Sequence, residues 1–212
     1  MRYYLLRQDQ GPDLRQALFV EGVPPGMLQA GLPVDPPGSP PRVTVSPVGE
    51  VASDFLEAPY LIVSDAVRRV LDAAGVDNVQ YFRADVDVAY AEGEIVASCW
   101  IANVVGAVAC AEHLPSAPTH APGPDVGRRV APGFRIDPVR ACGFDLFRLA
   151  EDRDLLVVSE RVAEALQAAG LRGVVLQDPA EYTGLPVNTA LPEPGTGVFR
   201  PSVAGVEPRV DI

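Results

Sequence analysis

The sequence predicts an α+β fold in which a mixed, mainly antiparallel sheet carries two repeated strand-helix-strand units. The segment "LIVSDAVRRVLDAAGVDNVQYF" at residues 61–82 recurs as "LVVSERVAEALQAAGLRGVVLQ" at residues 156–177. Each copy places a helical pattern between short β-branched or aromatic runs, which are typical of strands. Pro-rich segments separate the ordered blocks, as is typical of loops. We interpret the recurrence as an internal duplication.

Each copy is expected to begin its helix at a serine. Ser64 and Ser159 stand where an N-cap hydroxyl accepts a hydrogen bond from the first helical turn. Asp65 and Glu160 follow them, beside the positive end of the helix dipole. A serine at a strand-to-helix turn also resembles a nucleophile elbow, but that motif requires G-x-S-x-G, which neither copy has. We therefore interpret both serines as helix caps.

An apolar stripe runs along each predicted helix with the spacing i, i+3, i+4 and i+7, which indicates one face packed against a core. The stripe residues are Val67, Val70, Leu71 and Ala74 in the first copy, and Val162, Ala165, Leu166 and Ala169 in the second. Gly75 and Gly170 follow the stripes, and glycine readily adopts the positive φ that ends a helix. We expect both helices to end at these glycines.

Proline distribution suggests three parts of the chain. Residues 1–54 form an N-terminal Pro-rich segment with short strands, and residues 179–212 form a Pro-rich C-terminal tail. Residues 55–178 form the α+β domain, which contains both copies and a Pro-rich surface loop at 115–133. A pair of small subdomains joined by that loop is the alternative.

Composition excludes some classes of partner. The 212 residues are 48% hydrophobic, so the chain can bury a sizeable core. Seventeen basic against 28 acidic residues give a net charge of −11, which repels nucleic acid and anionic membranes and favours a basic protein partner. The first residues contain no secretory signal pattern, so we expect a cytoplasmic protein. The oligomeric state is left open.

One uncharged segment raises the question whether the chain crosses a membrane. Residues 95–111, "IVASCWIANVVGAVACA", carry no charge, but they fall short of the roughly 20 residues that a spanning helix needs. We expect a buried core segment instead, formed by a strand followed by another strand or a short helix.

Cysteine and histidine spacing gives no strong site. Three cysteines in a chain without an export signal are expected to be reduced. Cys110, His113, His120 and Cys142 are the right residue types for zinc, yet only "CAEH" has a ligand-like spacing, so we expect neither a metal nor another cofactor. An enzyme with Cys142 or Cys110 as nucleophile and His113 or His120 as base remains an alternative. No catalytic residue is assigned.

The segment "RADVDVAYAEGE" holds the acidic residues of most interest. On a strand, Asp85 and Asp87 alternate with two valines, so we expect both carboxylates to face solvent. As a catalytic pair they lack a nearby histidine, lysine or metal ligand. We predict instead that Asp85, Asp87, Glu92 and Glu94 contribute to partner binding through their charge.

Four sequence features together resemble a known family. They are the serine-capped unit followed by "NVQYF", the "WIANV" segment at Trp100–Val104, the "FRL" strand at Phe147–Leu149, and the "VVSE" unit at 157–170. Their order is similar to that in an immunity-protein family of bacterial polymorphic toxin systems, typed by a myxobacterial member and formerly a domain of unknown function. The resemblance covers roughly residues 60–178. The family has an acidic run where this chain has the Pro-rich segment 113–133.

The resemblance implies a non-enzymatic protein that binds a cognate toxin or secreted hydrolase and neutralises it in the producing cell. An adaptor or chaperone that escorts a secreted effector would use similar binding chemistry and is the alternative from another class. The two differ in whether the bound partner is inactive.

Overall fold

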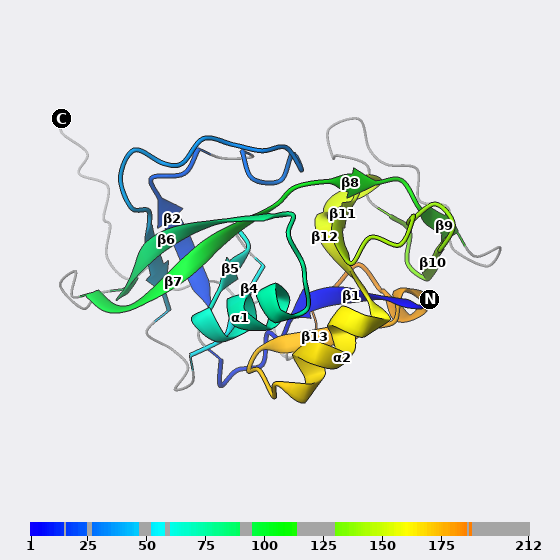
Figure 1. Cartoon of the computed structure of the whole chain (residues 1–212). Helices are drawn as coiled ribbons and strands as arrows, with labels where there is room; N and C mark the ends of the chain where they lie inside the picture. The colour runs from blue at the N-terminus through cyan, green and yellow to red at the C-terminus, as the bar shows by residue number, and fades with distance from the viewer. Residues whose placement is uncertain are drawn as a thin grey trace, which may run out of the picture.

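The computed structural model contains two large, mainly antiparallel sheets with two α-helices packed against them (Figure 1). It describes residues 1–14, 16–24, 27–46, 52–57, 60–89, 95–113, 130–185 and 187. The α+β class is therefore as predicted. Most of the loop at 115–133 and most of the tail at 179–212 lie outside the described residues.

The first large sheet has six strands in the order β2-β3-β6-β7-β5-β4. Its pairs are antiparallel except β3 with β6, which are parallel. The strands are β2 (Ala17–Glu21), β3 (Arg42–Val45), β4 (Phe55–Leu56), β5 (Ile62–Val63), β6 (Val79–Val88) and β7 (Ile95–Val104). Strands β6 and β7 form a hairpin and are the longest strands of this sheet. Strand β7 comes from the uncharged segment.

The second large sheet has five strands in the order β13-β1-β12-β11-β8, and β11 with β8 is its parallel pair. Its strands are β1 (Tyr3–Gln8), β8 (Ala107–Val108), β11 (Leu146–Leu149), β12 (Asp152–Ser159) and β13 (Val174–Gln177). A small sheet pairs β9 (Ala111–His113) with β10 (Phe134–Ile136), and the 3-10 helix η1 (Pro179–Glu181) follows β13. The strands thus divide among three sheets, whereas the sequence suggested one.

Two strand-helix-strand units have the same arrangement. Helix α1 (Asp65–Ala73) joins β5 to β6, and α2 (Glu160–Ala168) joins β12 to β13. The strands of each unit are parallel to each other because both pair antiparallel with one strand between them, β7 in the first unit and β1 in the second. Each helix therefore crosses over a strand that comes from elsewhere in the chain.

Both helices begin and end as the sequence predicts. The amide of Val67 donates to Ser64 Oγ at 3.4 Å, and the amide of Val162 donates to Ser159 Oγ at 3.5 Å. Gly75 and Gly170 follow the last helical turns with positive φ angles of 73° and 60°. The serines are therefore caps, placed by backbone geometry at the junction of strand and helix.

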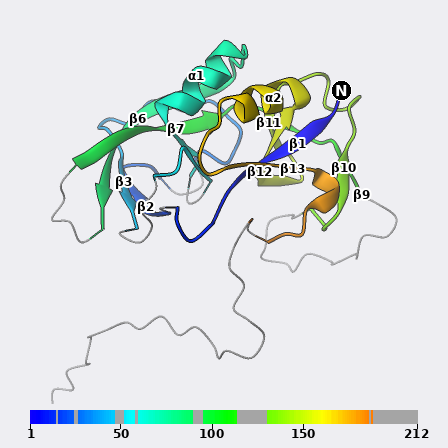
Figure 2. The same cartoon turned by 90° about the horizontal axis from the view of Figure 1, so that it is seen from below.

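The helices lie side by side on one side of the molecule (Figure 2). Beneath them lies a core cluster to which both helices and both large sheets contribute. In this cluster, Leu71 of α1 is 3% exposed and Leu166 of α2 is 1% exposed. A second cluster lies on the other face of the five-stranded sheet, and a third on the other face of the six-stranded sheet. Because each large sheet has a core cluster on both faces, its strands carry apolar residues on both faces.

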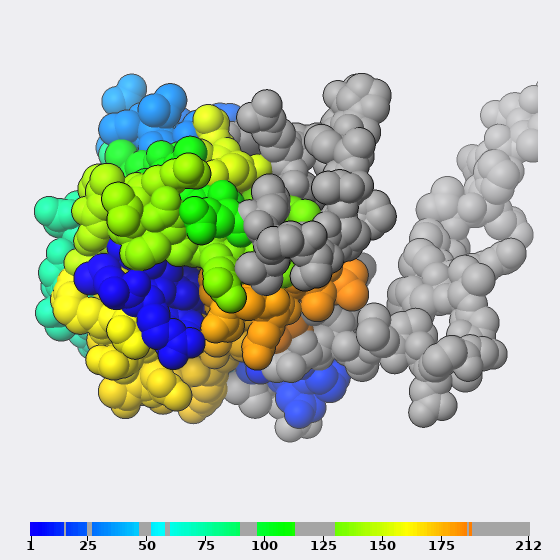
Figure 3. Space-filling model, turned by 90° about the vertical axis from the view of Figure 1, so that its right-hand side faces the viewer, coloured from blue at the N-terminus to red at the C-terminus, as the bar shows by residue number. Residues whose placement is uncertain are grey.

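The N-terminal residues belong to these sheets. β1 lies between β12 and β13, and its Leu5 is fully buried. Figure 3 shows the first residues of the chain (blue) reaching the surface beside the α2 segment (yellow). The N-terminal Pro-rich segment also supplies β2 and β3 to the other large sheet.

The uncharged segment 95–111 forms strand β7, the short strand β8 and the start of β9, so the prediction of a strand followed by a strand is confirmed. Among the described residues, no helix is long and apolar enough to cross a membrane.

Candidate partner-binding site

Burial affects the thiols of Cys99 and Cys110. Burial, followed by the nearby charge of Glu151, raises the pKa of Cys110 to about 12. Burial, followed by Asp85, raises the pKa of Cys99 to about 12. A thiol with such a pKa is protonated at neutral pH and is a weak nucleophile. Cys142 is exposed. The alternative of a cysteine enzyme therefore gains no support from Cys110.

No group of three potential metal ligands occurs among the histidine, cysteine, aspartate and glutamate residues that the structure describes. Cys110 is buried, whereas Cys142 is exposed. The backbone of His113 ends β9, and His120 lies outside the described residues. Of the four candidate donors, the described side chains are therefore those of the two cysteines, one buried and one exposed.

The acidic segment differs from its prediction at Asp87. This residue is only 7% exposed, and its Oδ2 lies 3.7 Å from Nη1 of Arg42 on the neighbouring strand β3. The expectation that both carboxylates face solvent was wrong, because β3 pairs with β6 and shields its end. Asp85 is half-buried. Glu92 and Glu94 lie outside the described residues.

A group of stacked side chains holds α1 to the β6–β7 hairpin. The Arg68 guanidinium lies 4.2 Å from the ring centre of Trp100 and 4.9 Å from that of Tyr81. Trp100 Nε1 donates to Asp65 Oδ1 at 2.6 Å, at the start of the helix. These contacts fasten the first turn of α1 to the sheet.

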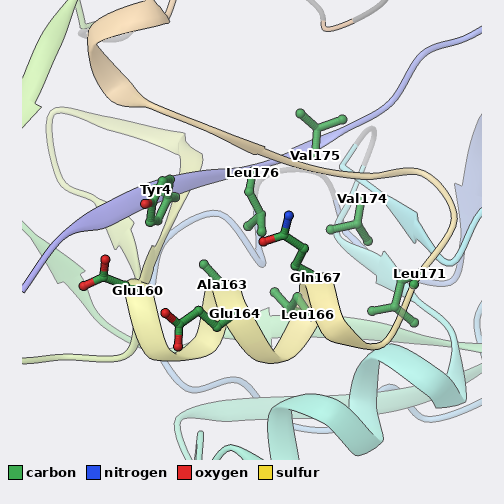
Figure 4. Close-up of a pocket in the computed structure, with 11 residues that line it drawn as sticks. Tyr4, Glu160, Ala163, Glu164, Leu166, Gln167, Leu171, Val174, Val175 and Leu176 are labelled. Atoms are coloured by element: carbon green, nitrogen blue, oxygen red, sulfur yellow. The ribbon is translucent and has the colours of Figure 1, made fainter.

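A groove of about 630 Å³ lies between α2 and β13, and we call it the α2–β13 groove. Figure 4 shows Val174 and Leu176 pointing from β13 towards α2, which carries polar side chains such as Glu164 beside the apolar Ala163 and Leu166. The lining residues are Tyr4, Glu160, Ala163, Glu164, Leu166, Gln167, Gly170, Leu171, Val174, Val175 and Leu176. They include two carboxylates and no basic residue, so the groove favours a cationic occupant.

The wall formed by β13 is a sheet edge. In the described sheet, β13 is the last strand and pairs with β1 alone. Asp9 N donates to the carbonyl of Gly173 at 3.0 Å, and this pair continues the register of Arg7 with Val175. Bonded and non-bonded pairs alternate in antiparallel sheets, so Val174 and Leu176 direct their N–H and C=O groups away from β1.

Sequence reasoning did not identify this groove. Glu160 was interpreted only through its position near the helix dipole, and no role was predicted for Glu164. The acidic pair at i and i+4 was the available signal. The groove also requires β13 to be the edge of the sheet, and that depends on β1 pairing with it from the far end of the chain.

No curated protein matches the chain. The model of an immunity protein family, Imm11, matches residues 7–181, which include both helices, η1 and every strand except the first part of β1. That range is wider than the 60–178 suggested by the sequence resemblance, and it begins inside β1. Because the match covers most of the sequence, the chain belongs to the Imm11 immunity protein family.

Proposed function

We propose that this protein is a non-enzymatic immunity protein that binds a cognate toxin in the cytoplasm of the producing cell and holds it inactive. The observation that carries the proposal is the family match over residues 7–181. The matched region contains most of the core residues, and the first part of β1, with Leu5 and Leu6, lies just before it.

Charge supports a basic toxin as the partner. The net charge of −11 speeds the capture of a cationic protein, since long-range attraction raises association rates more than it lowers dissociation rates. We include Asp85, Glu92 and Glu94 among the carboxylates that supply this attraction. Asp87 is assigned a structural role instead, because it is buried against Arg42.

Co-expression with the cognate toxin tests the function. We expect the toxin alone to arrest growth of a bacterial host, and the pair to restore growth and co-elute as a stable complex. The purified toxin should also lose its activity when this protein is added in equal amount.

The same measurements separate inhibition from escort. A complex in which the toxin keeps its full activity would identify an adaptor or chaperone and overturn the immunity assignment. Growth that stays arrested, with no complex detected, would overturn both functions.

A further inference from the structure

The α2–β13 groove combines an acidic helix flank with the edge of β13, which pairs with β1 alone among the described strands. Glu160 and Glu164 line the flank, while Val174 and Leu176 supply apolar side chains to the groove and outward-facing backbone groups to the edge. An unpaired edge can accept another strand through main-chain hydrogen bonds, and pockets beside it then select the side chains of that strand.

We propose that this groove binds an extended basic segment of the toxin, which pairs with β13 as an added strand. The inference rests on the proposed function and deepens it by naming the binding mode. Charge selects the occupant, because the groove contains two carboxylates and no cation among its lining residues. A second copy of this chain would bring the same two carboxylates and would add repulsion.

The spacing of the two glutamates indicates where the bound segment carries its basic residues. Glu160 and Glu164 are four residues apart on α2, which corresponds to a rise of about 6 Å. Alternate residues of a strand point to the same face and repeat every 6.6 Å or so. An added strand with arginine or lysine at positions i and i+2 therefore places one cation beside each carboxylate, while its other residues turn to the opposite face.

Hydrogen exchange on the full-length protein, free and bound to its toxin, tests the pairing. In the free protein the amides of Val174 and Leu176 should exchange quickly, whereas that of Val175 is bonded to β1 and should exchange slowly. Toxin binding should slow the Val174 and Leu176 amides by at least about tenfold, as expected for a new strand partner.

Charge is tested by the double variant Glu160→Gln with Glu164→Gln. Its affinity for the toxin should fall by about tenfold or more, since two charge-assisted contacts are lost. The matched control is Asp13→Asn with Asp77→Asn, which changes net charge equally at two exposed positions outside the groove. The control should lose much less affinity, and thermal unfolding should show that both variants fold.

The outcomes are distinct for the groove and for the function. A toxin that is bound and inhibited without added protection at Val174 and Leu176 overturns the strand pairing and leaves the function intact. Equal losses in the groove and control variants overturn the charge argument. Protection that appears without toxin, together with a dimer mass, assigns the edge to a second copy and overturns the proposal. Failure of the toxin to bind at all overturns both.

Discussion

Arg161 in the first turn of α2 donates a hydrogen bond from its guanidinium to the carbonyl oxygen of Ala74 at the end of α1. Helix α1 has no basic residue in its own last turn, so Arg161 supplies the positive charge that a helix C-terminus favours. The same guanidinium pairs with Asp145, which also accepts from Ser159 Oγ at 2.6 Å. The end of one helix is thus linked to the start of the other.

Replacement of Arg161 by alanine should weaken this link. Its side chain is 52% exposed, so we expect a loss of only about 1 kcal/mol in the free energy of unfolding. Urea denaturation measures the change. Arg69→Ala, at an exposed position on α1, is the control and should stay within about 0.5 kcal/mol of the wild type. Equal losses in the two variants would show that the helix link contributes nothing.

Asp145 makes part of the stability depend on pH. Burial acts to raise the pKa of this carboxyl, but the hydrogen bonds from Ser159 and Arg161 outweigh it and leave the pKa below its ordinary value. The folded state therefore favours the charged form. Its contribution is complete above the unfolded pKa of about 3.9 and is lost as the pH falls through the folded pKa.

Asp145→Asn should accordingly be less stable than the wild type at pH 7, and the difference should shrink below a pH of about 4. Denaturant titrations at several pH values measure this difference. A gap between the two proteins that stays constant down to pH 2.5 or so would remove Asp145 from the acid response.

Local patterns predicted the helices well because capping and amphipathic spacing act over a few residues. Ser64, Gly75 and the stripe containing Leu71 were each sufficient to place one boundary or face of α1, and the structure confirms them. The helix-ending interaction of Arg161 with Ala74 spans 87 residues, so no local pattern indicated it.

Sheet pairing was harder to predict because it depends on distant segments. Val86 and Val88 pack against the third core cluster as the alternation suggests, yet Asp87 is buried as well. Its burial requires β3 beside β6, and β3 comes from a Pro-rich segment that was not assigned to this sheet. The α2–β13 groove depends similarly on β1, because β1 pairs with one edge of β13 and no described strand pairs with the other.

The two repeat helices should respond alike to loss of their central leucines. Leu71→Ala and Leu166→Ala each leave a cavity beneath a helix, so we expect losses of about 2 to 5 kcal/mol in the free energy of unfolding. Thermal and urea unfolding measure both. A loss below about 1 kcal/mol in either variant would mean that the core collapses around the cavity at little cost.

The capping serines should differ from each other. Ser64→Ala should cost about 1 kcal/mol, as for an ordinary N-cap. Ser159→Ala should cost more, because Ser159 is fully buried and also donates to Asp145. Denaturation of both variants under one condition compares them. Equal costs would show that the bond to Asp145 adds nothing to the cap.

Charge reversal distinguishes Asp85 from Asp87. Asp87→Lys places a cation in a buried site beside Arg42, so we expect a loss of about 3 kcal/mol in stability. Asp85→Lys, at the half-buried neighbour, should keep the fold and slow association with a basic toxin. Stopped-flow association across a salt series provides the measurement, and a rate indifferent to both salt and the substitution would remove Asp85 from recognition.

Thiol alkylation tests whether any cysteine takes part in function. The pKa values of Cys99 and Cys110 are both raised to about 12, so both thiols stay protonated at pH 8 and react slowly. Cys142 is exposed, and we expect iodoacetamide to modify it alone in the native protein, with the other two reacting after unfolding. Peptide mass spectrometry identifies the modified residue.

Because an immunity protein acts by binding, the protein alkylated at Cys142 should inhibit the toxin as well as the untreated protein does. Loss of inhibition on alkylation, repeated in Cys142→Ser with unchanged thermal unfolding, would instead place this thiol in the functional site.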